Sequence, residues 1–502
     1  MVMLSLIDEN RRWYSLNSAS YDYLGEVKNE QGLKEAAEAA GIDAKSEMYK
    51  LPAMYVGSYA EKDAELTLEL FRVLSREMQK QNLQNVFDLE TNLFPCLVDM
   101  RFKGVRVDVE KAHTLKQKLV SQEEELLLQI KKETGIETQI WAARSIAQVF
   151  DKLSLPYSRT AKSNAPSFTK NFLQEHQHPL VQKIAKAREI NKAHTTFIDT
   201  ILKHEHKGRI HADINPIKSD TGGTVTGRFS YSNPNLQQIP ARNKDLGPMI
   251  RGLFIPEENC KWGCFDYSQQ EPRLVVHYAA TTEPICFNKS VTKIVEKFKD
   301  DSVDFHQTVA DMANISRSQA KTINLGLFYG MGKAKLQAEL GLSTKQEAEN
   351  LFNQYHDNVP FVRELMNRTS SFAQTSGSIG TLLGRKCRFD KWEPATFGMH
   401  TPMTLEEAER TYGRGRIRRA FTYKALNKLI QGSAADMTKK AMLDLYQEGI
   451  VPHIQIHDEL DLSIESDAQA KKIIEIMENA VTLAVPNKVD YESGNTWGEI
   501  NG

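Results

Sequence analysis

The sequence predicts a multidomain protein of the α+β class, and three observations lead to this prediction. Its 502 residues exceed what one hydrophobic core usually serves, so several packed subdomains are expected. Charge-rich stretches with apolar residues at helical spacing alternate with stretches punctuated by glycine and proline. Near the C-terminus, apolar and polar residues alternate on both sides of an acidic turn, which is typical of a β-hairpin.

The composition is that of an ordinary globular protein. Apolar residues make up 40% and charged residues 26% of the chain, and the formal net charge is −1. Any nucleic-acid-binding surface must therefore arise from a local segregation of charge. No apolar run is long enough to span a bilayer and no signal-peptide pattern opens the chain, so we expect no membrane contact and a cytoplasmic location.

The cysteines are odd in number and scattered along the chain. They are Cys96, Cys260, Cys264, Cys286 and Cys387. Cys260 and Cys264 form a CxxxC pair, but no second pair of Cys or His lies at zinc-ligand spacing. The cysteines are therefore predicted to be buried free thiols and not metal ligands.

The first part of the chain has helical patterns. The stretch to about residue 80 ends in apolar residues at helical spacing over 59–68. A second, charge-rich helical stretch covers residues 110–205, and solvated helical faces explain most of it.

The later part mixes strands and helices. Residues 208–290 have a strand-and-turn texture, and an apolar run within them stops at Asp266. Helical patterns then return over residues 290–410. Residues 453–464 alternate apolar and polar side chains around His457-Asp458-Glu459, which predicts a hairpin with carboxylates at its bend.

Asp266 and Asp458 form the first candidate site. An Asp after a strand is usually a turn or cap residue, and this structural alternative holds for each of them alone. If neighbouring strands bring the carboxylates together, they repel each other unless a cation such as Mg²⁺ neutralises them. Two ions about 3.5–4 Å apart stabilise both the attacking and the leaving oxygen of an in-line displacement. The two residues are therefore candidates for a metal-dependent transfer site.

A helical pattern over residues 317–330 is the second candidate site. Five residues fall on one face of it: Arg317, Lys321, Asn324, Leu325 and Phe328. Two cations one turn apart, followed by apolar residues, suit a triphosphate with its sugar and base. The alternative is an amphipathic helix with solvent-facing cations. Gly326 and Gly330 argue against it, because each glycine costs about 1 kcal/mol inside a helix.

The third candidate is the polar, turn-rich segment 226–242. Arg228 and Arg242 lie near its ends, with Asn and Gln between them. Such side chains bind phosphates, sugar oxygens and the minor-groove acceptors that all base pairs share. A plain surface loop is the alternative.

Together these segments resemble the family A DNA polymerases in content, order and spacing, from near residue 1 to Trp497. Asp266-Tyr-Ser-Gln-Gln-Glu-Pro-Arg273 and His457-Asp-Glu459 are similar to the two carboxylate motifs of that family. The segment from Arg317 to Gly330 is similar to its fingers-helix motif. Further matches are TGRxS at 226–230, PNLQ at 234–237, Asp304-Phe-His306, Gly384-Arg385 and Gln431-Gly-Ser-Ala-Ala-Asp436.

The resemblance implies a right-hand polymerase. Its palm contains an antiparallel sheet, its thumb and fingers are helical, and an incomplete exonuclease-like domain precedes them. The expected divisions are the exonuclease remnant at 1–80, palm entry at 81–115, thumb at 116–205, palm at 206–290, fingers at 291–410 and the C-terminal part of the palm at 411–502.

The resemblance also implies roles at the carboxylates. Asp266, Asp458 and the backbone carbonyl of Tyr267 would hold two Mg²⁺ ions, and Glu459 would support the metal site or the primer end. Lys321 would donate a proton to the pyrophosphate that leaves.

The resemblance also implies that the chain is a monomer that binds dNTPs and primer–template DNA, and it implies which residues contact them. Residues expected at the nucleotide are Arg317, Lys321 and His306 on the triphosphate, Glu271 where a ribose 2′-hydroxyl would lie, Leu325 on the sugar and Tyr329 near the templating base. Residues expected along the DNA minor groove are Arg228, Asn235, Gln237, Arg242, Asn427, Gln431 and His457.

Three positions depart from the family pattern. Leu325 stands where the family usually has Phe or Tyr, a feature of some phage members that favours a viral source. Pro272 replaces an apolar helix former, which a first helical turn tolerates. Tyr423-Lys424 occurs where the family often has a primer-contacting Arg, so that contact is not expected here.

The N-terminal stretch is the largest departure. Residues 4–70 resemble the last third of the family's 3′–5′ exonuclease, and Tyr59 and Asp63 match its final motif. The earlier carboxylate motifs would lie before residue 1, and Asp88-Leu-Glu90 has their form only by coincidence. Because nuclease chemistry needs the full carboxylate set, we expect no proofreading by this chain alone. A shortened chain, or a split polymerase completed by a second polypeptide, would explain the pattern.

Three other functions fit the sequence less well. A single-subunit RNA polymerase shares the palm carboxylates and the Arg/Lys helix, but Glu271 and the QGSAAD segment argue against it. An inactive DNA-binding scaffold is disfavoured because Asp266, Asp458, Arg317 and Lys321 are all present. A purely nucleolytic role is disfavoured by the missing carboxylates.

Leu325→Phe is expected to change sugar discrimination. Leucine keeps an apolar contact with the sugar but lacks the rigid flat ring, so the substitution should alter dNTP incorporation against dideoxy-NTP incorporation. Single-turnover kinetics with both nucleotides measure this, and unchanged kinetics for both would remove any role of Leu325 in sugar selection.

Overall fold

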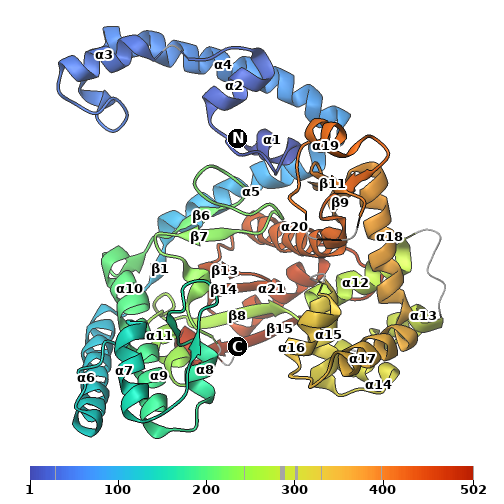
Figure 1. The fold of residues 1–502 in the computed structure, drawn as a ribbon. Coiled ribbons are helices and arrows are strands. Elements are labelled where there is room, and N and C mark those ends of the chain that lie inside the picture. Colours follow the sequence, from blue (N-terminus) through green and yellow to red (C-terminus); the bar gives the residue numbers. More distant parts are fainter. Residues whose placement is uncertain are drawn as a thin grey trace.

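The structure is a computed structural model, and it describes residues 1–28, 30–241, 243–282, 289–299, 304–328, 331–396, 398 and 400–500. A four-stranded antiparallel sheet lies at the centre, with helical lobes on either side and an N-terminal group of helices beyond them (Figure 1). No helix in these ranges has the length and apolar character needed to cross a membrane.

The central sheet has the strand order β13-β14-β8-β15. Its strands are β13 (Ile454–Ile456), β14 (Glu459–Ile464), β8 (Lys261–Tyr267) and β15 (Val489–Gly494). β13 and β14 form the predicted hairpin, with His457 and Asp458 as its two-residue connection. His457 has a φ of +58°, the left-handed conformation that tight hairpin turns require.

The two faces of this sheet differ in chemistry, because side chains alternate along a strand. Phe265, Tyr267 and Leu460 point to one face and are buried in the core that the sheet shares with three helices. These helices are α5 (Gln84–Lys103), α20 (Ala425–Gln447) and α21 (Asp467–Asn479). The opposite face carries Asp266 and Glu459, which are directly paired across β8 and β14. The sheet is therefore amphipathic, with carboxylates on its second face.

One helical lobe extends from residue 109 to residue 204 and has its own core around Ile130, Phe150 and Ile184. Its helices are α6 (Val109–Thr134), α7 (Ala143–Lys152), α8 (Lys170–Glu175), α9 (Pro179–Lys192), the π-helical turn η2 (Ala193–Ile198) and α10 (Asp199–His204). Asp108 caps the start of α6, and Gly135 ends it with a φ of +75°.

The second helical lobe lies on the other side of the sheet, with a core around Phe305, Ile323, Tyr355 and Phe361. Its helices are α12 (Gln270–Thr281), α13 (Lys289–Lys297), α14 (Phe305–Ala313), α15 (Arg317–Phe328), α16 (Lys333–Glu339), α17 (Lys345–Asn358) and α18 (Pro360–Ser376). Pro272 lies in the first turn of α12, as predicted.

The N-terminal group contains α1 (Val2–Ile7), α2 (Leu16–Leu24), α3 (Gln31–Ala39), the 3₁₀ turn η1 (Met48–Lys50) and the long helix α4 (Ala53–Lys80). The described residues before 81 form helices and turns and no strand. An ion pair between Arg388 and Glu9, 2.7 Å long, ties this group to the rest of the molecule.

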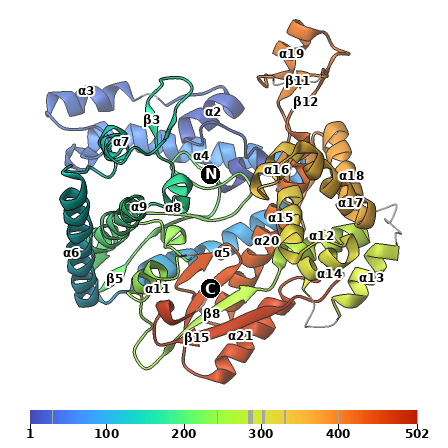
Figure 2. The ribbon, with the colours of Figure 1, turned by 60° about the horizontal axis from the view of Figure 1, so that its bottom comes forward.

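Short strands complete the fold. They are β1 (Val105–Arg106), β4 (Glu205–His206) and β5 (Arg209–Ile210) in one sheet, and the pairs β2 (Ser158–Arg159) with β3 (Pro166–Ser167), β6 (Asp213–Asn215) with β7 (Ser230–Ser232), β9 (Ser378–Gly380) with β10 (Lys386–Arg388), and β11 (Trp392–Pro394) with β12 (Ile417–Arg419). β11, β12 and α19 (Leu405–Tyr412) form a projection (Figure 2).

The predicted secondary structure was wrong in two parts of the chain. Residues 208–290 contain the helices α11 (Leu246–Arg251) and α12, although turns dominate the sequence pattern. Residues 290–410, predicted as helical, also hold the strands β9 to β11. These strands are three residues long, too short for an alternating pattern to be recognised.

A buried cluster of four charges joins three segments that are far apart in sequence. Arg385 binds Glu90 at 2.5 Å and Asp436 at 2.9 Å, and Lys439 binds Glu90 at 2.6 Å. All four side chains are almost fully buried, and burial lowers the pKa of Lys439 to about 8. Since buried charges are tolerated only when they are paired, the cluster fixes α5, the β9–β10 turn and α20 relative to one another.

Lys439→Met is expected to destabilise the fold by about 3 kcal/mol or more, because Glu90 then keeps a buried charge with one cation fewer. Lys440→Met is the matched control. Lys440 binds Asp444 one turn away at a partly exposed position, and such a pair contributes about 0–1 kcal/mol. Thermal and denaturant unfolding measure both variants, and equal losses would contradict the role of the cluster.

Candidate active site

Asp266 and the acidic turn lie side by side in the central sheet. Asp266 is directly opposite Glu459 in the register of β8 and β14. The backbone N–H of Tyr267 donates to the carbonyl oxygen of Asp458 at 3.2 Å. The structure therefore brings together two carboxylates that are nearly two hundred residues apart in the sequence.

These carboxylates lack enough neutralising partners. Burial, followed by the charges of Asp458, Glu459 and Asp490, raises the pKa of Asp266 to about 8. Burial, with Glu271 adding to it, raises the pKa of Asp458 to about 6. The Oδ1 atom of Asp266 is buried without a hydrogen-bond partner among the described residues. Oxygen donors that repel each other in this way fit a hard divalent cation such as Mg²⁺.

Glu271 is held beside this pair by an ion pair. It lies in the first turn of α12, and Arg228 contacts its Oε1 at 2.6 Å. Arg228 follows Gly227, which has a φ of +82°, and a Cβ at residue 227 would lie 2.6 Å from Nε of Arg385. Only glycine fits here, so the loop that presents Arg228 rests directly on the buried charge cluster.

The residues predicted to share one face of α15 differ in exposure. Arg317 is 51% exposed and its Nε donates to Asp304 at 2.8 Å, and Lys321 is also exposed. Asn324 was expected on this face, but it is fully buried. It contacts Nδ1 of His306 at 3.0 Å and accepts from the Tyr355 hydroxyl at 2.5 Å. Asn324 therefore links α14, α15 and α17 instead of facing a ligand.

His306 is neutral in this environment. Burial, together with the charges of Lys321 and Arg317, outweighs Asp304 and lowers its pKa to about 4. The side chain of Leu325, and Tyr329, lie outside the described residues, so the structure does not place these two predicted contacts.

The comparisons with known proteins address the family directly. A model of DNA polymerase family A matches residues 109–499. The chain belongs to this family. It is therefore a DNA-directed DNA polymerase, a nucleotidyltransferase, and the resemblance found in the sequence is confirmed.

Three similar proteins illustrate the relationship. The DNA-directed DNA polymerase of Pseudomonas phage M6 is 34% identical over 99% of this chain and 78% of its own length. DNA polymerase DpoZ of Acinetobacter phage SH-Ab 15497 is 29% identical over 99% of the chain and 84% of its own length. The thermostable DNA polymerase I of Thermus filiformis is 32% identical over 89% of the chain and 52% of its own length.

A solved structure confirms the fold class. The POL domain of Pol1 from M. smegmatis, in a complex with DNA primer-template and dNTP, superposes with a TM-score of 0.76. The alignment covers 99% of this chain and 81% of that one, at 23% identity. The protein thus has the right-hand α+β fold of a polymerase.

Two of the residues expected along the DNA are tied to the acidic hairpin, since Gln237 contacts Gln455 and His457 belongs to the turn. Gln237 donates from Nε2 to Gln455 of the hairpin at 3.2 Å, and Asn235 accepts from the backbone of Gln237 in the 3₁₀ turn η3 (Leu236–Gln238). His457 is exposed at the tip of the hairpin. Asn427 and Gln431 lie one turn apart on α20 and are partly exposed. Arg242 lies outside the described residues.

The exonuclease-like residues of the N-terminal group are paired with a lysine. Nζ of Lys28 lies 2.6 Å from a carboxylate oxygen of Asp63 and 3.3 Å from the hydroxyl of Tyr59. The carboxylate that the family motif assigns to a metal is therefore neutralised by Lys28 in this structure.

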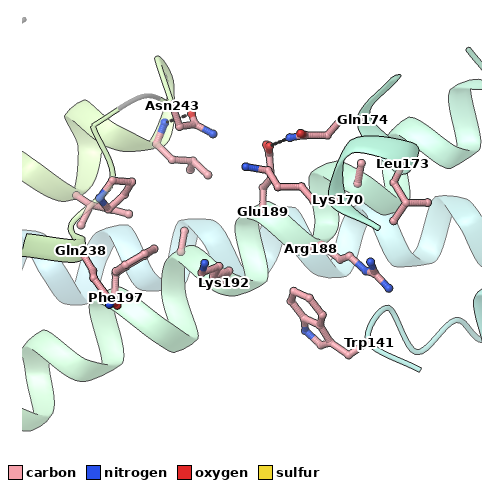
Figure 3. A pocket seen from close by; sticks show the side chains of 15 residues that line it. Trp141, Lys170, Leu173, Gln174, Arg188, Glu189, Lys192, Phe197, Gln238 and Asn243 are labelled. Carbon is pink, nitrogen blue, oxygen red and sulfur yellow. Dashed lines mark hydrogen bonds between the residues drawn. The ribbon is translucent and has the colours of Figure 1, made fainter. Parts of the chain in front are cut away.

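A cavity of about 460 Å³ lies away from the carboxylates, between the first helical lobe and residues 238–250 (Figure 3). Arg188 lies over the ring of Trp141 at 5.1 Å, and Gln174 donates to Glu189 at 2.5 Å. None of the described site residues predicted from the sequence lines this cavity.

Sequence reasoning missed Asp461. It is fully buried on the carboxylate face of the sheet, two residues after Glu459, and its Oδ1 accepts from Nε1 of Trp262 at 2.8 Å. The alternation of Glu459 and Asp461 in the hairpin strand was the available signal, because residues two apart in a strand share a face.

Proposed function

We propose that this polymerase extends a primer 3′ end with dNTPs on a DNA template by two-metal phosphoryl transfer at Asp266 and Asp458, releasing pyrophosphate. The observation that carries the proposal is the pairing of Asp266 with the Asp458 turn. It holds two carboxylates close together, raises their pKa values and leaves a buried oxygen of Asp266 without a partner among the described residues.

Asp266, Asp458 and the backbone carbonyl of Tyr267 would hold two Mg²⁺ ions. Bound there, the ions would activate the primer hydroxyl and neutralise charge on the phosphates. Tyr267 is well suited to a rigid role, because its hydroxyl donates to the carbonyl oxygen of Met477 at 2.6 Å and its ring is buried. Glu459, opposite Asp266, would support this site or the primer end.

The triphosphate would be bound by α14 and α15. Lys321 forms no ion pair within the described part of the chain, so its ammonium group is available to a phosphate and can donate a proton to the leaving pyrophosphate. When the nucleotide binds, Arg317 would contact the triphosphate, either in place of Asp304 or together with it.

His306 would contribute a hydrogen bond and not a charge. The Tyr355 hydroxyl donates to Oδ1 of Asn324, which leaves the amide nitrogen of Asn324 to donate to Nδ1 of His306. The proton of the neutral ring then resides on Nε2, which can donate to a phosphate oxygen. Leu325 on the sugar and Tyr329 near the templating base complete the proposed nucleotide site.

Glu271 would select deoxyribonucleotides. Its ion pair with Arg228 fixes the carboxylate beside Asp458, where a ribose 2′-hydroxyl would meet both a steric and a desolvation barrier. Arg228 would thus act on the nucleotide through Glu271 as well as on the DNA.

Primer–template DNA would lie over the acidic turn, with its minor groove against Arg228, Asn235, Gln237, Arg242, Asn427, Gln431 and His457. Readout of the shared minor-groove acceptors is nearly independent of sequence, which suits an enzyme that must copy any template. We also propose that the chain acts as a monomer in the cytoplasm of a host cell, with residues 116–205 as its thumb and 291–410 as its fingers.

Asp458→Asn is expected to lower primer extension by about a thousandfold or more, because a lost cation ligand removes several kcal/mol of transition-state stabilisation. Binding of primer–template should persist. Asp490→Asn is the matched control, since Asp490 is an exposed carboxylate opposite Asp266 that has no proposed role. If Asp458→Asn extends a primer with Mg²⁺ at the rate of the wild type, the mechanism is contradicted.

We further propose that this chain alone does not proofread. Among its described residues before 81 there is no strand to carry further metal-binding carboxylates, and Lys28 neutralises Asp63. Pure protein is expected to leave single-stranded DNA intact. Degradation from the 3′ end that is lost in Asp63→Ala would overturn this proposal, whereas degradation that appears only with a second polypeptide would support a split nuclease.

A further inference from the structure

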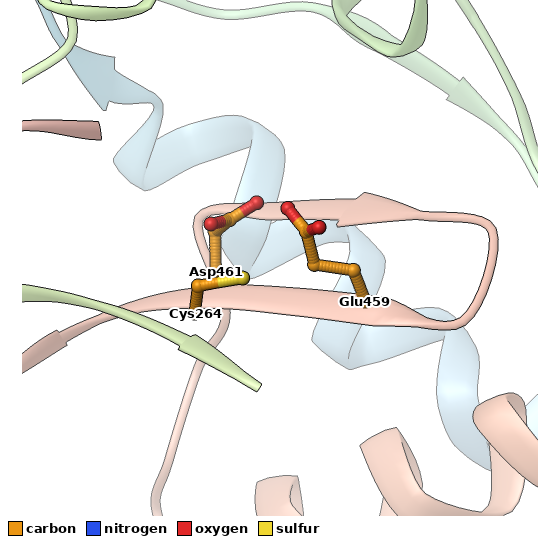
Figure 4. Close-up of side chains that lie close together, drawn as sticks. All are labelled: Cys264, Glu459 and Asp461. Carbon is orange, nitrogen blue, oxygen red and sulfur yellow. The ribbon is translucent and has the colours of Figure 1, made fainter. Parts of the chain in front are cut away.

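Three donor groups gather on the carboxylate face of the central sheet, next to the catalytic pair. Asp461 is directly opposite Cys264 in the register of β14 and β8, and Glu459 is the next residue on the same face. Their ligand atoms, one thiol sulfur and two carboxylate oxygens, all lie within 4.8 Å of one another (Figure 4).

The two carboxylates of this group are not neutralised by the described residues. Asp461 is 0% exposed, and its Oδ1 accepts from the indole N–H of Trp262. Its Oδ2 and Oε1 of Glu459 are buried without hydrogen-bond partners in the described part of the chain. Burial, followed by the charge of Glu459, raises the pKa of Asp461 well above its usual range.

Arg251 does not remove the problem. Its charge lowers the pKa of Asp461, but burial outweighs it, and its guanidinium lies over the ring of Trp497 at 4.4 Å. Unpaired buried carboxylates are unfavourable, and a bound ion is one way in which proteins satisfy such groups. An unpartnered, fully buried oxygen that faces a thiol and a second carboxylate is such a case.

We propose that Cys264, Glu459 and Asp461 bind a zinc-type divalent cation at a third site, beside the Mg²⁺ pair. One thiolate and two carboxylates suit borderline ions such as Zn²⁺ or Co²⁺, whereas Mg²⁺ prefers oxygen donors alone. Zn–S and Zn–O bonds of about 2.0–2.3 Å place tetrahedral donors about 3.5 Å apart, so small side-chain rotations close the site. The Cys264 thiol releases its proton to solvent when the ion binds.

The position of this third site connects it to catalysis. Cys264 and Asp266 are two residues apart on β8, a separation of about 7 Å along a strand. Glu459 is shared, because it faces Asp266 across the strands and also belongs to the new site. The effect of the ion on extension rests on the proposed function, but binding of the ion does not.

Co²⁺ is the probe for the first experiment, because cobalt bound to a thiolate has a charge-transfer absorption band that oxygen ligands do not give. The wild-type chain is expected to show this band at one Co²⁺ per chain. Cys264→Ser and Asp461→Asn should lose it, and the amide oxygen that Asp461→Asn introduces still accepts from Trp262. The matched control is Cys260→Ser, a partly exposed thiol four residues away that lies outside the cluster.

Thermal unfolding gives a second readout that does not depend on colour. Zn²⁺ is expected to raise the Tm of the wild type and of Cys260→Ser, and to leave the Tm of Asp461→Asn unchanged. Without metal, Asp461→Asn should be at least as stable as the wild type, because the substitution removes an unpaired buried carboxylate. This comparison also shows that the variant is folded.

Absence of the thiolate band in the wild type would overturn the proposal and favour a proton shared by the two carboxyl groups. Persistence of the band in Asp461→Asn, or its loss in Cys260→Ser, would also overturn it. Asp458→Asn should retain the band. Primer extension with Mg²⁺ is measured on the same wild-type preparation, so inactivity with an intact band contradicts the proposed function and not the third site.

Discussion

The antiparallel pairing of β8 with β14 is the constraint on which the candidate site depends. It places Asp266 opposite Glu459 and leaves a two-residue turn to present Asp458. Because side chains alternate along strands, a slip of one residue would turn every carboxylate into the hydrophobic core. The apolar face of the same strands, with Phe265 and Leu460 fully buried, makes that slip very unfavourable and so fixes the position of the acidic groups.

The surrounding helices extend this constraint to the rest of the site. The buried cluster of Glu90, Arg385, Asp436 and Lys439 joins α5 and α20 behind the sheet, and the backbone at Gly227 packs against Arg385. The loop after Gly227 presents Arg228, which in turn holds Glu271. A network of buried charges thus determines where the proposed sugar-selecting carboxylate lies.

Much of the site could be predicted from the sequence, because its signals are local. The hairpin follows from alternation around residues 457–459, and the family follows from the order of its motifs. The burial of Asn324 could not be predicted, because helical spacing defines a face but not what packs against it. The charge cluster and the Arg228–Glu271 pair were missed for a related reason: their partners lie far apart in the chain, and no short-range pattern links them. Glu90 was dismissed as part of a coincidental DxE, yet it binds two cations in the core.

The proposed mechanism depends on Asp266 and Asp458 holding the catalytic ions jointly. The most direct test is a crystal structure with a dideoxy-terminated primer–template, the next dNTP and Mn²⁺, with the ions located by anomalous scattering. We expect two ions bonded to the carboxylates of Asp266 and Asp458, one of them also to the carbonyl of Tyr267, beneath the triphosphate. Ions bound elsewhere, with either aspartate outside their coordination spheres, would contradict it.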